Sequence, residues 1–271
     1  MRLRVKHQTS YTYESPIASA IQTLRLTPRS YEALTVLRWD VRGEGRRDLP
    51  VFTDGLGNIT HCHSVSHPHT GAAVLVEGEV ETKNTHGVVR GTAEPLPPLF
   101  FLRRTPLTQP DEAIEALAQS VARPGPVLKW LHAWLNTVRD KVDYRVGTTD
   151  SASTAAEALA AGSGVCQDHA HLFIAGARLM GIPARYVGGY LWTGEEQREY
   201  QASHAWAEAF VGDLGWVGFD ASNRICPTEA YIRTSVGLDY WSAAPVRGVR
   251  RGLAAETLAV SVRVSQAGAE Q

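Results

Sequence analysis

The chain has 271 residues, and its 27 Lys and Arg against 28 Asp and Glu leave a formal net charge of -1. This balance gives no general electrostatic reason to expect a nucleic acid or an anionic membrane as partner. A hydrophobic share of 44% with 20% charged residues is ordinary for a globular protein, and the length suits one large domain or two modest ones.

The first residues alternate basic and apolar side chains and lead into no long apolar segment, so we expect neither a signal peptide nor a transmembrane helix. The three cysteines, Cys62, Cys166 and Cys226, are too few and too widely spaced for a disulfide framework or a zinc module. Free thiols in a reducing compartment fit this usage, and we therefore expect a cytoplasmic protein.

Strand patterns dominate the first part of the chain. Apolar and polar residues alternate at its start, and further apolar runs cover residues 21–27, 34–41 and 73–82. The Asp-Gly-Leu-Gly-Asn segment at 54–58 indicates a tight turn between two strands. We therefore predict a β-rich, sandwich-like N-terminal domain at residues 1–100.

Four histidines of this region raise the question of a metal site. His61 and His63 would face the same side of a strand, and His67 and His69 follow closely. The expected neighbouring strands supply no obvious further ligand, and alternating histidines also occur on exposed strands. We expect no bound metal, although the residues alone leave the question open.

A Pro-rich passage at residues 94–106 separates this region from a helical one, and we place the domain boundary there. Helical spacing follows at 111–118 and 126–139, the second with a clear apolar stripe. A strand pattern returns in the tail at 258–264. We predict a second domain at residues 105–271, to which this tail could add a closing strand.

Residues 162–181 place a cysteine at the start of a helix. Small, turn-forming residues precede Cys166, and the helical pattern ends at Gly181, just before Pro183. Backbone N–H groups in the first turn of a helix stabilise an anion, so this position favours a reactive thiolate. A buried structural cysteine would more often lie in the middle of a helix, but placement alone does not exclude it.

Three strand patterns follow, at 184–192, 203–211 and 215–220, and their spacing favours an antiparallel meander. A short turn joins the last two strands. It brings Asp220 back beside His204.

Cysteine catalysis needs a thiolate, a base that takes its proton, and an acceptor that orients the base. Cys166, His204 and Asp220 supply one of each, in the order helix, strand, strand. This order is more specific than the three residue types alone, although His204 could be a structural sheet histidine and Asp220 could cap the turn that follows. Glu208, on the same face as His204, is a candidate ion-pair partner of Arg185.

Several blocks resemble the core of the transglutaminase-like superfamily, in its bacterial branch. They are Gly-Val-Cys-Gln-Asp-His-Ala at 164–170, Gly-Ile-Pro-Ala-Arg-Tyr-Val-Gly-Gly-Tyr at 181–190, His-Ala-Trp-Ala-Glu at 204–208 and Gly-Trp-Val-Gly-Phe-Asp at 215–220. The runs at 11–16 and 24–29 resemble the β-rich domain that precedes the core in those bacterial proteins. The resemblance implies an α+β protein with a papain-like/transglutaminase core, in which the helix that carries the nucleophile packs on an antiparallel sheet.

By this resemblance Cys166 is the nucleophile, His204 the general base and acid, and Asp220 the residue that orients His204. It implies amide-bond chemistry on a protein or peptide substrate through a thioester, with hydrolysis by water or transamidation by an amine. The sequence does not separate the two outcomes, but many bacterial members resemble proteases or amidases. The chain has no EF-hand pattern of acidic residues, so we predict no metal dependence and no cofactor.

The oxyanion of such a reaction needs at least two donors. The Cys166 N–H is one candidate, and the family commonly uses an aromatic side chain upstream of the cysteine, for which Tyr144 is our hypothesis and Gln167 an alternative. Tyr144 could equally pack at a strand edge. Trp206 and His169 are candidates for the substrate cleft, although each could instead pack beside the site or on the helix surface.

A polypeptide- or glycopeptide-binding protein that retains the fold without catalysis is the alternative function. The complete set of three candidate catalytic residues argues against it. The sequence leaves open the natural acyl donor, the oligomeric state and the role of the N-terminal domain.

Overall fold

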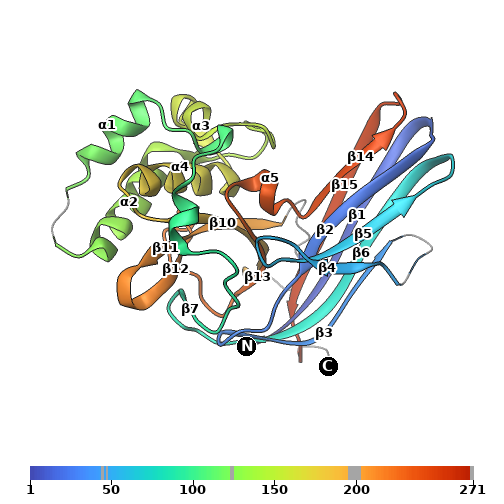
Figure 1. Ribbon diagram of the computed structural model, residues 1–271, viewed down its shortest axis with the longest axis horizontal. Helices are drawn as coiled ribbons and strands as arrows, with labels where there is room; N and C mark the ends of the chain where they lie inside the picture. Colours follow the sequence, from blue (N-terminus) through green and yellow to red (C-terminus); the bar gives the residue numbers. More distant parts are fainter. Residues whose placement is uncertain (44–45, 47, 123–124, 195–202, 269–271) are drawn as a thin grey trace.

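The computed structural model describes residues 1–43, 46, 48–122, 125–194 and 203–268. A β-rich part with long strands lies beside a mixed part that holds the helices (Figure 1). The strands of the β-rich part are β1 (Arg2–Ile17), β2 (Ser19–Thr27), β3 (Leu34–Gly43), β4 (Val51–Thr53), β5 (Ile59–Val65), β6 (His69–Thr82), β14 (Val246–Arg251) and β15 (Glu256–Gln266).

The β-rich part consists of two four-stranded antiparallel sheets, ordered β15-β1-β6-β3 and β14-β2-β5-β4. Along β1 most odd-numbered side chains are buried, from Leu3 to Thr9 without exception, and most even-numbered ones face solvent, as the alternating sequence requires. Apolar side chains from both sheets, including Leu24, Val41 and Val76, pack together between them. The predicted β-rich N-terminal region is therefore present.

The C-terminal strands belong to these same sheets. β15 pairs with β1 from Leu3 opposite Gln266 to Tyr13 opposite Glu256, and β14 pairs with β2. The sequence prediction assigned this tail to the core at residues 105–271, and the pairing differs from it. Alternation identifies a strand but not its partner, because the partner is set by contacts more than 200 residues away in the chain.

The mixed part is built on a sheet ordered β13-β10-β11-β12-β7. The strands of this sheet are β7 (Val88–Val89), β10 (Ala184–Leu191), β11 (His204–Val211), β12 (Gly215–Phe219) and β13 (Tyr231–Gly237). The parallel pair β8 (Asp143–Tyr144) and β9 (Ser163–Gly164) lies apart from it. No helix in the described ranges is long and apolar enough to cross a lipid bilayer. The helices are α1 (Glu112–Ser120), α2 (Val127–Lys141), α3 (Ala155–Ala161), α4 (Cys166–Leu179) and α5 (Tyr240–Ala243), with short 3₁₀ turns at Pro98–Leu102, Pro106–Thr108 and Gly212–Leu214.

Helix α4 packs against β10 and β11 (Figure 1). The β11 side chains that face this core are Ala205, Ala207 and Ala209, and their small size lets the helix lie close to the sheet. The protein thus has the α+β core that the resemblance implied, with the cysteine helix packed on an antiparallel sheet.

The two parts share a buried contact. Leu3 and Val262 of the β-rich part pack with Tyr190 and Ile232 of the core sheet. The Tyr190 hydroxyl also lies 2.9 Å from Nδ1 of the buried His7 on β1. The β-rich part is therefore fixed against the core through β1 and β15.

Candidate active site

Cys166 is the first residue of α4, and local hydrogen bonds fix the start of this helix. The Asp168 carboxylate accepts the Val165 N–H at 2.7 Å and the Thr149 hydroxyl at 2.6 Å. Glycine is required at 164, because a Cβ there would lie 2.7–2.9 Å from atoms of Asp168. As the first helical residue, Cys166 has a backbone N–H outside the helical ladder of hydrogen bonds.

His204 and Asp220 meet across the hairpin formed by β11 and β12. His204 opens β11 and Asp220 directly follows β12, and Nε2 of the imidazole lies 2.7 Å from Oδ2 of the carboxylate. Burial lowers the pKa of His204, but the Asp220 carboxylate and contact with the Cys166 thiol outweigh it and raise this pKa to about 10. With Nε2 engaged by Asp220, Nδ1 is the nitrogen left for the thiol.

Asp220 is buried and accepts several further hydrogen bonds. Its Oδ1 accepts the Ser222 hydroxyl at 2.6 Å, and its Oδ2 accepts the Asn223 amide and the Tyr231 hydroxyl, each at 2.7 Å. Burial raises the pKa of Asp220, but His204, Ser222 and Asn223 lower it well below its usual range. Asp220 thus both caps the turn that follows and holds His204, so the two sequence interpretations are compatible.

Tyr231 is a neighbour of Asp220 that sequence reasoning missed. It lies on β13, eleven residues beyond Asp220, and no motif or spacing connects the two. Only the order of the strands, with β13 beside β10, brings the phenol into the buried site.

Cys166 and His204 both line a cleft of about 290 Å³. Gln167 lines the same cleft, and its side-chain amide donates to the Asp150 carbonyl at 3.3 Å. The opposite wall comes from β1 and β15 of the β-rich part. The structure therefore brings the candidate nucleophile and base together at the boundary between the two parts.

Tyr144 lies beside the start of α4, because β8 pairs with β9 and places Tyr144 opposite Gly164. Burial, together with the charges of Cys166 and Asp220, raises the pKa of Tyr144 to about 12, so its hydroxyl stays a hydrogen-bond donor at neutral pH. Its ring stacks on His169 at a centroid distance of 6.1 Å.

His169 does not lie in the cleft. It is fully buried, and its ring nitrogens lie 2.8 Å from the backbone carbonyls of Val165 and Val142. The expected substrate contact is replaced by a structural one that ties the end of α2 to the start of α4. A helical spacing of three residues placed His169 near Cys166 but did not show which way the ring points.

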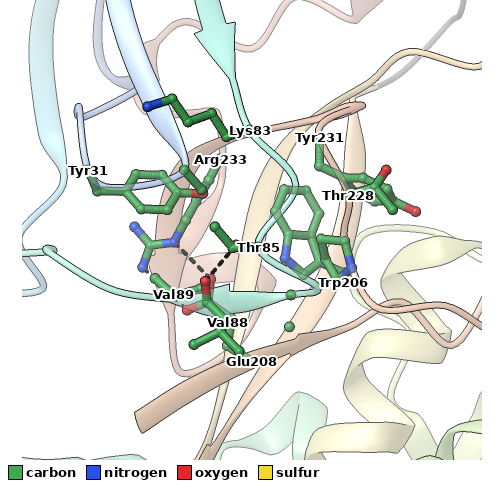
Figure 2. A pocket seen from close by; sticks show the side chains of 14 residues that line it. Tyr31, Lys83, Thr85, Val88, Val89, Trp206, Glu208, Thr228, Tyr231 and Arg233 are labelled. Carbon is green, nitrogen blue, oxygen red and sulfur yellow. Dashed lines mark hydrogen bonds and ion pairs between the residues drawn. The ribbon is translucent and has the colours of Figure 1, made fainter. Parts of the chain in front are cut away.

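Trp206 also lies outside the cleft. Its ring is buried, stacks on His204 at 6.2 Å and lines a separate cavity of about 20 Å³, which has room for about one water molecule. Figure 2 shows this cavity, with Trp206 and Tyr231 on one side and Tyr31, Arg233 and Glu208 on the other. Trp206 therefore packs behind His204 and is not available to a substrate in the cleft.

The N-terminal histidines have other neighbours. His61 Nε2 lies 3.0 Å from the Thr27 hydroxyl, and His63 Nδ1 lies 3.1 Å from the Gln22 side chain. His67 and His69 contact each other edge to face, with ring centroids 6.0 Å apart. Within the described part of the chain, no group of three or more His, Cys, Asp or Glu side chains could hold a metal ion.

The chain belongs to the transglutaminase-like superfamily. Residues 115–221 match the Transglutaminase-like superfamily core, and residues 3–81 match the Bacterial transglutaminase-like N-terminal region. An uncharacterized protein of Mycobacterium leprae is 34% identical over 98% of this chain and 99% of its own length. An uncharacterized protein of Mycobacterium tuberculosis is 30% identical over 92% of this chain and 87% of its own.

Among solved structures, the fold is similar to that of a "Putative Cysteine Protease from Cytophaga hutchinsonii". The TM-score is 0.79 at 21% identity, covering 100% of this chain and 92% of that one. This likeness extends over both parts of the protein. The family and the fold together support cysteine-based catalysis in general.

Proposed function

We propose that this protein is a cysteine hydrolase that cleaves amide bonds of a peptide or protein through a thioester on Cys166. The observation that carries the proposal is that Cys166 and His204 line one cleft, while Asp220 holds Nε2 of His204 at 2.7 Å from behind. A position at the start of a helix, beside a protonated imidazole, stabilises a thiolate. The free cysteines suit a reducing compartment such as the cytoplasm.

In the proposed reaction Cys166 and His204 take part in the bond changes, and Asp220 supports His204 throughout. His204 takes the thiol proton, and Sγ of Cys166 attacks the amide carbonyl carbon to form a tetrahedral intermediate. As the C–N bond breaks, His204 returns that proton to the leaving amine, and a thioester remains. Water then gives up a proton to His204 and attacks the thioester, which releases a carboxylic acid and restores the thiol. Asp220 keeps the imidazole oriented and stabilises its positive form.

The same thioester would accept a primary amine in place of water. This second outcome is transamidation, and it uses the same three residues. Incubating peptide amides with and without an added primary amine, followed by mass spectrometry, separates the two products. Cys166→Ala is the control, because every product of the proposed reaction depends on this thiol.

The reactivity of the thiols tests the proposal without a known substrate. Near neutral pH we expect iodoacetamide to label Cys166 at least about tenfold faster than Cys62 or Cys226. Burial raises the pKa of Cys226 to about 11, so this thiol stays protonated and slow. In His204→Ala the advantage of Cys166 should disappear, as peptide mapping by mass spectrometry would show. Equal, slow labelling of all three in the native protein would favour the binding protein without catalysis.

A substitution of Tyr144 tests the proposed oxyanion donor. Removing one such donor typically lowers turnover by about 10²–10³-fold, so we expect a loss of this order in Tyr144→Phe. The rate of Cys166 alkylation should change little, because alkylation builds no oxyanion. Gln167→Ala is the comparison, since Gln167 is the other candidate donor. Unchanged turnover in Tyr144→Phe, with a loss in Gln167→Ala, would transfer the role to Gln167.

A further inference from the structure

The wall of the cleft opposite Cys166 comes from the β-rich part. On β1 the side chains of His7, Thr9 and Tyr11 share one face, and they line the cleft together with Leu258 and Val260 of β15. The register pairs Tyr11 with Leu258 and Thr9 with Val260, so these side chains form one continuous surface. The N-terminal region and the C-terminal tail thus meet at the candidate active site.

This wall and the core side of the cleft are both uncharged apart from the His204–Cys166 pair. The core contributes Tyr186 and Tyr240, the uncharged polar residues Gln167 and Ser203, and small or apolar residues of α4, β10, β11 and α5 and their ends. Burial, with smaller effects of neighbouring charges, raises the pKa of Tyr186 and of Tyr11 well above the usual range, so both remain neutral phenols. Among the described residues that line the cleft, none is Asp, Glu, Lys or Arg.

His7 at the inner end of the wall is neutral as well. Burial lowers its pKa to about 4, and its ring nitrogens contact the hydroxyls of Tyr190 and Thr9, each at 2.9 Å. A charged group brought into this cleft would therefore lose water without gaining an opposite charge on the β-rich wall. An apolar group would gain by burial against Tyr11, Leu258 and Val260.

We propose that the β-rich part is the specificity wall of the active site, and that the acyl donor presents an uncharged, apolar side chain to Tyr11, Leu258 and Val260. This inference rests on the proposed function, because it assigns the substrate class of that same site. At about 290 Å³ the cleft is near the lower end of the usual range for small-molecule pockets, which suits one or two residues of a peptide.

The test uses electrophiles that alkylate Cys166 and therefore needs no turnover. The probes are chloroacetyl derivatives of leucine amide, asparagine amide, glutamate amide and lysine amide, each rate being divided by its rate with glutathione. We expect the leucine probe to label Cys166 about tenfold or more faster than the two charged probes. Asparagine, which is uncharged and close to leucine in size, should fall between them.

Variants of β15 connect this preference to the wall. Leu258→Glu should remove the advantage of the leucine probe and favour the lysine probe, because it adds a carboxylate to the cleft. Ala259→Glu is the matched control: it adds the same charge one residue along the strand, where the side chain points to the opposite sheet face. Both positions are exposed, so both variants should fold, and thermal unfolding checks this.

The outcomes separate the two proposals. Equal normalised labelling rates for all probes in the native protein would overturn the specificity wall. So would a ranking of the probes by rate that Leu258→Glu leaves unchanged. Either result would count against the wall even if the protein hydrolyses peptide amides in a Cys166-dependent way. A leucine preference that Leu258→Glu removes, in a protein that turns over no amide, would support the wall and count against the proposed hydrolase.

Discussion

Replacing Glu208 with glutamine is expected to lower the free energy of unfolding by about 3–5 kcal/mol, the cost of breaking a buried ion pair by removing one partner. Glu208 on β11 is 1% exposed. It accepts Nε of Arg185 at 2.7 Å and Nε of Arg233 at 2.8 Å. Burial raises the pKa of Glu208, but the two guanidinium groups lower it overall, so the carboxylate is charged in the folded protein.

The cost is large because the two arginines have few other acceptors. Arg185 also donates to Glu94 at 3.0 Å and lies 3.9 Å from the centre of the Trp216 ring, so it stays partly compensated when Glu208 is neutral. Arg233 donates to Glu208 through both Nε and Nη2, and it would keep its charge although its side chain is only 12% exposed. The network also anchors residue 94 of the Pro-rich passage to the core sheet.

Urea unfolding of Glu208→Gln and of a surface control measures this effect. Glu77→Gln removes a carboxylate that pairs with Arg42 at 2.7 Å, but the Glu77 side chain is 55% exposed and that of Arg42 is 25% exposed. Exposed pairs contribute about 0–1 kcal/mol, so this control should unfold almost like the native protein. Equal losses in the two variants would mean that burial does not amplify the Glu208 pair.

The sequence predicted those parts of the fold that depend on local patterns. The glycines before Cys166 and the helical spacing after it located the start of α4, and the alternation of β11 with a short turn placed Asp220 beside His204. The suggested pairing of Glu208 with Arg185 is confirmed at 2.7 Å. In each case the contact follows from one helix, one hairpin or one pair of adjacent strands.

Features that depend on distant strand pairing could not be predicted. The tail strand β15 pairs with β1 and not with the core sheet. The sequence pattern of neither strand alone therefore predicts that Tyr11 and Leu258 together form a wall of the cleft. Tyr231 reaches Asp220 only through the strand order of the core sheet. For Trp206 and His169 the sequence left open whether each lines the cleft or packs beside it, since periodicity gives a side chain's direction only approximately.

Asp220→Asn is the second prediction with a large expected effect: Cys166-dependent turnover should fall by about 10²–10⁴-fold. The amide is close in size to the carboxylate but carries no charge. It can also present an N–H group to Nε2 of His204, which favours the wrong tautomer of the imidazole. The rate of Cys166 alkylation near neutral pH should fall with turnover, because an unprotonated His204 no longer supports the thiolate.

The pH dependence of stability follows from the same pair. The pKa of His204 is about 10 in the folded protein against 6.5 for the free side chain, so protonation of His204 stabilises the fold. This contribution is fully present below pH 6.5 and is lost as pH rises through about 10. In Asp220→Asn the contribution of the carboxylate is lost, and the lowering of the His204 pKa by burial is opposed only by the contact with the Cys166 thiol. The stability difference between the native protein and the variant should therefore be large at pH 6 and shrink toward pH 10.

Tyr231→Phe separates the charge of Asp220 from its positioning. The variant removes one donor, the phenol 2.7 Å from Oδ2, and leaves the carboxylate charge and its contact with His204 in place. We expect a loss of turnover of about tenfold or less, the effect of one hydrogen bond. In the plot of turnover against pH, the alkaline limb, where turnover falls as His204 loses its proton, should stay near pH 10. In Asp220→Asn that limb should move to lower pH, because the carboxylate is the larger of the two contributions that raise the pKa of His204. If Asp220→Asn instead kept native turnover and the native alkaline limb, Asp220 would only cap its turn, and His204 would act without it.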